Sequence, residues 1–119
     1  MNENVVNEFV TFYYNCLNTK SEHLLSPYLK NNTKIIRNNC EFTGVENILN
    51  GISVLNGISS LCYYTPLKYN VMMNGDRRAN IIVSGKINGT MLYFSEFILL
   101  SLSNRKEYWI HSSIFQVTD

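Results

Sequence analysis

The segment that most restricts the fold is residues 91–102, which is apolar on both sides if it forms a strand. Alternate residues of a strand share a face, so one side carries Leu92, Phe94, Ile98 and Leu100. The other side carries Met91, Tyr93, Phe97 and Leu99. An antiparallel strand with one solvated face is polar at every second position. One face can cover the helices of the chain, and the other needs a loop, the first helix or a second subunit to shield it.

The length of 119 residues fits one domain, residues 1–119, which can bury a core without disulfides or metals. Charged residues make up 16% of the chain, against about 25% in typical domains. We therefore expect a partner to shield part of the surface, unless the many Asn side chains take the place of the charges. The net charge of +1 argues against direct binding of nucleic acid, which needs a clustered basic face.

The three cysteines, Cys16, Cys40 and Cys62, are odd in number and lack the spacing of a metal site. They are expected to be reduced, largely buried thiols of a protein in the cytosol or nucleus. The sequence shows no signal peptide and no apolar run near the roughly 18 residues of a membrane span. We therefore expect no contact with a membrane.

Helical patterns fill the first half of the chain. A first helix is predicted from apolar residues at helical spacing, which are Val6, Phe9, Val10, Tyr13 and Leu17. Thr19 with Glu22 predicts a capping box for a short second helix, which ends near Pro27. After a strand at residues 33–37, Thr43 with Glu46 predicts a second capping box. It begins a third helix, whose end the glycines at 51 and 57 bracket and whose apolar residues are Val45, Ile48, Leu49 and Ile52.

The second half of the chain alternates like strands. Two Asn-Gly pairs, at 74–75 and 88–89, predict hairpin turns. The strands around them are expected near residues 67–71, 79–87, 91–102 and 108–117. Helices followed by a meander predict an α+β fold, with three N-terminal helices packed on one face of an antiparallel sheet.

This order of elements resembles the nuclear transport factor 2 family, and five motifs carry the resemblance. They are F-V-T-F-Y-Y at 9–14, residues 25–28 before the first strand, F-T-G at 42–44, Y-F-S-E-F-I-L at 93–99, and the terminal strand from Trp109 to Phe115. The match runs over nearly the whole chain. It implies a strongly curved, cone-shaped sheet. It also implies one of three roles: a homodimeric import carrier for Ran-GDP, the small subunit of an mRNA-export heterodimer, or an enzyme or scaffold on the same fold.

The resemblance also says where cargo would bind. The import carrier holds Ran through acidic side chains, and the position after the first strand is Asn38 here. The loop before the long strand is reduced to Asn88 and Gly89, without a carboxylate. A neutral amide loses most of the electrostatic attraction in such a contact. These changes favour the export subunit, although the last-strand Arg that forms an ion pair across the exporter dimer is Gln116 here. Whether nucleoporin repeats bind is left open.

By strand parity and by the resemblance, the dimer interface is expected at six positions, Ile82, Tyr93, Phe97, Leu99, Ile114 and Gln116. The alternative is that these are ordinary exposed strand residues. If all six are buried, the gross gain is on the order of 10 kcal/mol, and association costs consume a large share of it.

Catalysis finds little support in the sequence. Asp76 falls in a predicted turn and Asp119 at the terminus, so neither is expected to be a buried base. Glu96 and His111 lie on neighbouring strands, where pairing could bring them together for proton transfer, although a polar cross-strand pair is the simpler interpretation. No phosphate loop, nucleophile elbow or metal cluster is visible. We predict no cofactor, no enzyme activity, and a transport protein of the nucleus, the cytoplasm and the nuclear pore.

Overall fold

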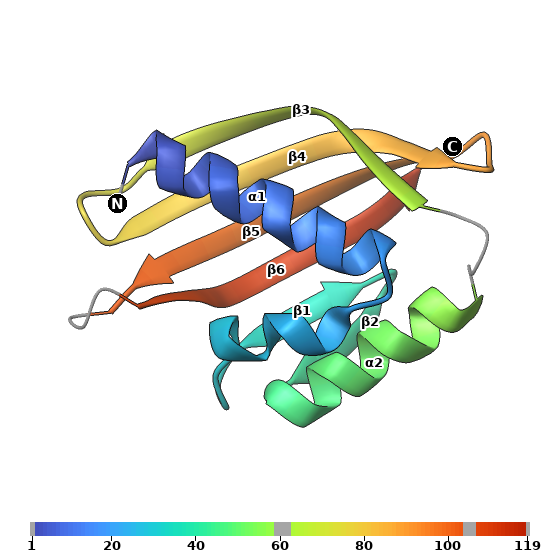
Figure 1. Cartoon of the computed structure of the whole chain (residues 1–119), viewed down its shortest axis with the longest axis horizontal. Helices are drawn as coiled ribbons and strands as arrows, with labels where there is room; N and C mark the ends of the chain where they lie inside the picture. The colour runs from blue at the N-terminus through green and yellow to red at the C-terminus, as the bar shows by residue number, and fades with distance from the viewer. Residues whose placement is uncertain (1, 59–62, 104–106, 119) are drawn as a thin grey trace.

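The computed structural model describes residues 2–58, 63–103 and 107–118. Its elements are α1 (Glu3–Asn18), the 3-10 helix η1 (Glu22–Tyr28), β1 (Lys34–Arg37), β2 (Cys40–Thr43), α2 (Val45–Ile58), β3 (Tyr63–Met73), β4 (Arg78–Asn88), β5 (Tyr93–Leu102) and β6 (Tyr108–Thr118). Figure 1 shows the helices on one side of a long, curved sheet. The α+β class predicted from the sequence is confirmed.

The first helix forms where the apolar spacing predicts it. Its whole predicted stripe is buried, from Val6 to Leu17. The side chain of Asn2 accepts a hydrogen bond from the backbone N–H of Val5 at 3.0 Å, which satisfies one of the free donors at the helix start. The helix ends at Asn18, whose side-chain amide pairs with the backbone of Tyr64 in both directions at 2.7 Å. This pair ties the end of α1 to the start of β3.

The second helix is real, but its predicted capping box is wrong. The residue before η1 is Ser21, and it makes no side-chain capping bond. The Thr19 hydroxyl instead donates to the carbonyl of Asn15 at 2.8 Å, because Thr19 directly follows the last residue of α1. The helix is of the 3-10 type and contains Pro27.

The sheet has six strands in the order β2-β1-β6-β5-β4-β3. It is antiparallel throughout except that β1 runs parallel to β6, which the expected antiparallel sheet did not include. Two hydrogen bonds hold the ends of β1 in this direction. The Thr33 hydroxyl donates to the Ile110 carbonyl at 2.7 Å, and the N–H of Asn38 donates to the Phe115 carbonyl at 3.1 Å. Pairing direction is set by these long-range contacts and leaves no local signal.

The strand β2 was not predicted. It pairs with β1 across a two-residue turn in which Asn38 and Asn39 have φ of 50° and 71°. Asn tolerates this left-handed backbone, which tight hairpins require. The third helix also differs, because it runs through Gly51 instead of ending there. A Cβ on Gly51 would lie 2.5 Å from the ring of Phe42, so the glycine allows α2 to approach β2 closely.

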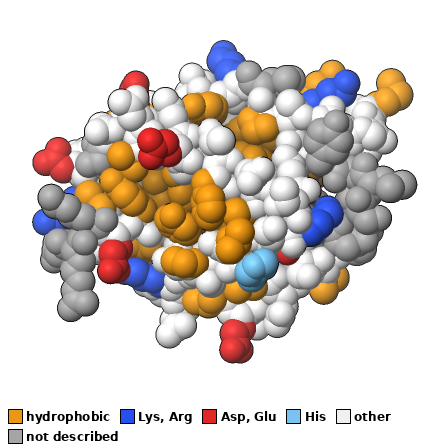
Figure 2. Space-filling model, in the orientation of Figure 1, with side chains coloured by type: hydrophobic (Ala, Val, Ile, Leu, Met, Phe, Trp, Pro, Cys, Tyr) orange, Lys and Arg blue, Asp and Glu red, His pale blue; other side chains and the backbone are white. Residues whose placement is uncertain are grey.

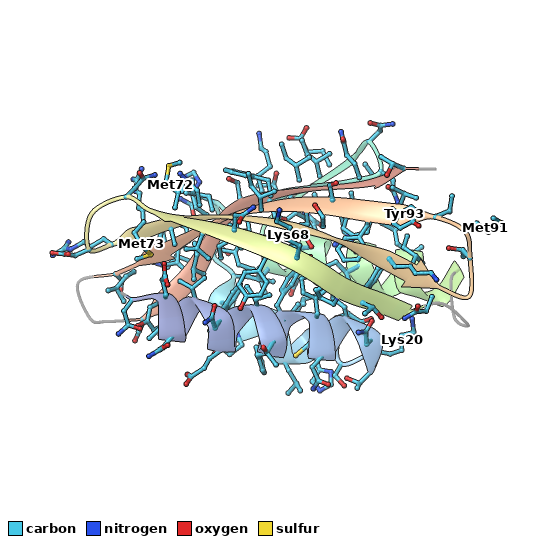
Figure 3. The ribbon with its side chains drawn as sticks, turned by 90° about the horizontal axis from the view of Figure 1, so that it is seen from above. Lys20, Lys68, Met72, Met73, Met91 and Tyr93 are labelled. Atoms are coloured by element: carbon cyan, nitrogen blue, oxygen red, sulfur yellow. The ribbon has the colours of Figure 1, made fainter. Side chains whose placement is uncertain are left out.

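The core lies between the helices and the concave face of the sheet. Buried apolar side chains of α1, η1, α2 and β1, β4, β5 and β6 form one cluster. Seen from the helix side, apolar side chains also gather on the surface over α1 and η1 (Figure 2). Figure 3 shows α1 on one side of the sheet, while side chains of the opposite face project away from it. We call this opposite face the outer face.

One expectation about the cysteines is wrong. Cys16 is buried as expected, but Cys40 is exposed because it begins the edge strand β2 directly after the turn. Cys62 lies outside the described residues.

Candidate interaction surface

The strand β5 alternates as its sequence predicts. Its inward side chains include Phe94, Glu96 and Ile98, which are at most 1% exposed. Its outward side chains include Tyr93 and Phe97, which are 52% and 37% exposed. Large apolar side chains therefore stand on the outer face of the central strands.

Cross-strand pairing collects four of these outward side chains into one line. Phe97 pairs with Ile82 on β4 and with Ile114 on β6, and Ile114 pairs with Ile36 on β1. Ile82 and Ile114 are 51% and 44% exposed. We call Ile82, Phe97, Ile114 and Ile36 the apolar row. Directly opposed side chains of neighbouring strands touch, so the row is a continuous apolar strip across the outer face.

The other predicted interface residues flank this row. Leu99 is half-buried, two residues along β5 from Phe97. Gln116 is exposed and pairs with Ser95, so it belongs to a polar line beside the row. Tyr93, the first residue of β5, lies beyond that line (Figure 3). The structure thus brings all six predicted positions onto one face.

Two members of the face were missed by sequence reasoning. Ile36 could have been found from the parity of its strand, because it alternates with the buried Ile35 and Arg37. Met72 is 65% exposed on β3 and pairs with Asn80, the partner of Leu99. Its place depends on the β3–β4 register, which shifts between Pro66 and Lys68. That shift carries no clear sequence signal.

Charges on the outer face are few and mostly basic. Lys34 on β1 and Glu41 on β2 form an ion pair at 3.0 Å, with both side chains 55% exposed. Lys68 and Lys86 are exposed near the other edge of the sheet. Asn38, the position where the family resemblance places a cargo carboxylate, is exposed in the β1–β2 turn. Its amide is neutral, so this turn offers no charge to a basic partner.

The predicted pair of Glu96 and His111 does not form. Glu96 points into the core and pairs in register with Phe115, whereas His111 is exposed beside the ring of Trp109 at 5.6 Å. His111 lies four residues from Phe115 along β6, so the two strands hold Glu96 and His111 apart.

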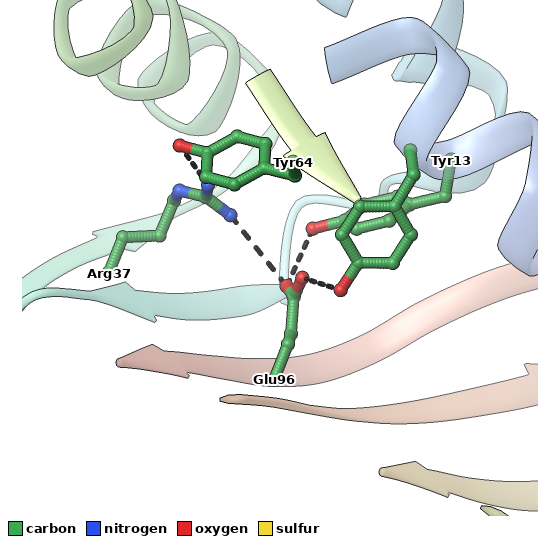
Figure 4. Close-up of polar contacts among 5 residues, drawn as sticks. Tyr13, Arg37, Tyr64 and Glu96 are labelled. Atoms are coloured by element: carbon green, nitrogen blue, oxygen red, sulfur yellow. Dashed lines mark hydrogen bonds and ion pairs between the residues drawn. The ribbon is translucent and has the colours of Figure 1, made fainter. Parts of the chain in front are cut away.

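The actual partners of Glu96 lie inside the cone of helices and sheet (Figure 4). The hydroxyls of Tyr13 and Tyr14 donate to its two carboxylate oxygens at 2.7 Å each. Arg37 Nη1 lies 3.7 Å from Glu96 Oε2. The guanidinium of Arg37 also stands over the ring of Phe115 at 4.1 Å. We call Tyr13, Tyr14, Arg37 and Glu96 the buried polar cluster. Sequence reasoning missed it, although Arg37 and Glu96 each share the parity of buried neighbours.

The cluster places charged groups in the interior of the fold. Arg37 and Glu96 are 2% and 1% exposed. Burial raises the pKa of Glu96, and Arg37 and the two tyrosine hydroxyls offset part of that rise. Burial and the Glu96 charge raise the pKa of Tyr13 and Tyr14, so both remain donors. Arg37 Nη2 also donates a hydrogen bond to the Tyr64 hydroxyl at 3.5 Å, whereas the buried Nη1 has no hydrogen-bond partner among the described residues.

Two other kinds of site were sought in the part of the chain that the structure describes. No group of three or more His, Cys, Asp or Glu side chains is placed to hold a metal ion. Within the same residues, no helix has the length and apolarity to cross a membrane.

Comparisons with known proteins agree with this architecture. The family model for the nuclear transport factor 2 (NTF2) domain matches residues 5–117. No curated protein matches the chain in sequence. Among solved structures, nuclear transport factor 2 from Cryptosporidium parvum is similar with a TM-score of 0.75 and 19% identity, over 94% of this chain and 90% of that one.

Two further structures show how widely the fold is used. The yeast UBP3-associated protein BRE5 has a TM-score of 0.81 and 16% identity, over 98% of this chain and 96% of its own. An uncharacterised protein with a cystatin-like fold from Caulobacter vibrioides has a TM-score of 0.87 and 8% identity, over 98% and 89%. At these identities the structures establish the fold alone. The family model, which covers nearly the whole chain, shows that this protein belongs to the nuclear transport factor 2 domain family.

Proposed function

We propose that residues 1–119 act as one non-enzymatic, protein-binding domain in nucleocytoplasmic transport, as the small subunit of an mRNA-export heterodimer. Its larger partner, an export receptor subunit, packs on the outer face of the sheet. The domain then works in the nucleus, in the cytoplasm and at the nuclear pore, and it needs no cofactor.

The apolar row is the observation that carries this proposal. Ile82, Phe97 and Ile114 are 51%, 37% and 44% exposed in the isolated chain, side by side. Burying a large apolar side chain gains about 1.5–3 kcal/mol, so the six proposed interface positions supply a gross gain on the order of 10 kcal/mol. Part of this is lost to the cost of association. A second sheet stacked on this face would supply the burial.

Charge supports export over import of Ran. The turn residue Asn38 is neutral, and the acidic residue near it on β2, Glu41, is already paired with Lys34 at 3.0 Å. A carboxylate that is already paired gains less from a second cation. The structural likeness to nuclear transport factor 2 of Cryptosporidium parvum keeps a homodimeric carrier of Ran-GDP as the second candidate.

The interior argues for a binding role over an enzymatic one. The space where an enzyme of this fold would hold its substrate contains the buried polar cluster, whose Arg37 and Glu96 are almost fully buried. Yeast Bre5, which shares this fold, is the cofactor in a solved complex with the deubiquitinase Ubp3. A protein partner therefore has a precedent on this fold.

The experiment compares three tagged chains expressed in cells of the source organism: wild type, Phe97→Asp and Val54→Asp. Val54 is the matched control because it is 64% exposed on α2, away from the outer face. We expect wild type and Val54→Asp to co-purify with one larger protein in equal amounts, and Phe97→Asp to lose it. Binding is then measured against purified Ran-GDP and Ran-GTP.

Three results would contradict the proposal. The first is that wild type recovers Ran-GDP alone. The second is that Phe97→Asp retains the larger partner. The third is that sedimentation shows the wild-type chain as a monomer with no partner at all.

A further inference from the structure

The helix side of the molecule holds a hollow that the proposed sheet-face assembly does not use. It has a volume of about 290 Å³ and is lined by Val5, Glu8, Phe9, Phe12, Tyr28 and Tyr108. These residues come from α1, η1 and the first residue of β6, so three separate elements meet there. Figure 2 shows apolar side chains gathered over α1 and η1, the two elements that supply most of this lining. We call it the aromatic groove.

The rings of the groove are held by one another. Tyr28 packs against Phe9 at 5.8 Å and against Phe12 at 5.4 Å between ring centroids. Phe9 is 6% exposed, so the floor of the groove is part of the core. Rings that are already fixed lose little freedom when a ligand enters, and the groove is thus preorganised.

A carboxylate stands at the rim of these rings. Glu8 is exposed, and it is the charged residue among those that line the groove. A second hollow along α1, of about 450 Å³, shares Glu8 and Phe12 with the first and is otherwise lined by Asn7, Thr11 and Asn15. Within α1 the charged residues are Glu3 and Glu8, without a Lys or Arg. The groove is therefore locally acidic on a chain whose net charge is +1.

Aromatic faces beside a carboxylate favour a cation over a neutral apolar group. A cation over an aromatic ring is attracted by the ring quadrupole, and a nearby carboxylate adds direct attraction. Arginine suits both features, because its planar guanidinium stacks on rings and its fork of N–H donors matches a carboxylate. Its apolar stem can pack along the ring edges. The same chain contains such a contact already, with Lys30 Nζ 4.2 Å from the centre of the Trp109 ring.

We propose that the aromatic groove binds an arginine side chain of a peptide segment in a partner protein. The guanidinium lies among Phe12, Tyr28 and Tyr108 and pairs with Glu8, and neighbouring peptide residues follow the second hollow along α1. The site is independent of the outer face, so one molecule can hold a sheet partner and a peptide at the same time.

The test uses four fluorescent Gly-Ser peptides that differ at one central residue: arginine, citrulline, phenylalanine or glutamate. Citrulline has the shape of arginine without its charge, so the pair isolates the cation. Affinity is measured by anisotropy, and the binding site by NMR shifts of Tyr28 and Tyr108. We expect the arginine peptide to bind about tenfold more tightly than the citrulline peptide, and added salt to reduce the difference.

Variants separate the groove from other effects. Glu8→Gln should weaken arginine binding about three- to tenfold and leave citrulline binding unchanged. Glu46→Gln is the matched control, because Glu46 is an exposed carboxylate in the first turn of α2, and we expect it to bind like wild type. Phe97→Asp should also bind like wild type, so a failure of the sheet-face proposal leaves this test intact.

The proposal is overturned by any of three results. The first is that the phenylalanine peptide binds as tightly as the arginine peptide or more tightly, which would identify an apolar docking site instead. The second is that Glu8→Gln binds the arginine peptide with the affinity of wild type, which would contradict the proposed ion pair with Glu8. The third is that the arginine peptide shows no saturable binding at millimolar concentration and low salt, which would contradict the proposed site.

Discussion

Removing one charge of the buried polar cluster should destabilise the fold more than almost any other single substitution. Glu96→Gln keeps the shape of the side chain and an oxygen for Tyr13 or Tyr14, but leaves the Arg37 guanidinium buried without a counter-charge. Arginine cannot lose its proton to relieve this. Arg37 is 2% exposed, so water cannot screen it. Breaking a buried ion pair in this way costs about 3–5 kcal/mol.

Removing the other charge, that of Arg37, should lower the free energy of unfolding by less at acidic pH than at neutral pH. Arg37→Met leaves Glu96 with its two tyrosine donors at 2.7 Å. The Glu96 carboxyl can also take up a proton, since burial already raises its pKa. Replacing both residues together removes both buried charges. The double variant is expected within about 2 kcal/mol of wild type, because a buried pair and an apolar replacement are often close in stability.

Urea unfolding followed by the fluorescence of the single tryptophan, Trp109, measures these differences. For a domain of this size, 1 kcal/mol corresponds to about 4 °C in Tm, so Glu96→Gln should lower Tm by about 12–20 °C. The coupling energy comes from the double-mutant cycle. The reasoning is refuted if Glu96→Gln is as stable as wild type, or if the double variant is less stable than both single variants.

Two further predictions concern packing and thiol reactivity. Gly51→Ala should destabilise the fold by about 1–3 kcal/mol despite its better helix propensity, because the added methyl meets the ring of Phe42; unchanged urea stability would contradict the close approach. In native protein that carries Cys62→Ser, an aromatic disulfide reagent should show a fast-reacting thiol that Cys40→Ser removes and Cys16→Ser does not, since Cys40 is exposed whereas Cys16 is buried with a raised pKa; a fast phase that survives Cys40→Ser in this background would contradict the prediction.

Apolar spacing and turn residues predicted several elements correctly, whereas the capping box of Thr19 and Glu22 was wrong. The stripe of α1 from Val6 to Leu17, the two Asn-Gly turns and the alternation of β5 were all found from spacing and residue type. Gly51 was misjudged because its role is to admit a ring from another element. The strand β2 was missed because its turn is the pair Asn38-Asn39, a weaker hairpin signal than Asn-Gly.

The sequence by itself determined the class of fold and the inward and outward faces of the long strand. These follow from the period of two in a strand, which is a property of neighbouring residues. Only the tertiary structure decided that β1 runs parallel to β6, that Glu96 meets Arg37 and two tyrosines instead of His111, and that rings from three elements enclose the aromatic groove. Each of these depends on which distant segments pack together. The free energy of such packing comes from contacts between residues far apart in the chain, so no local pattern predicts it.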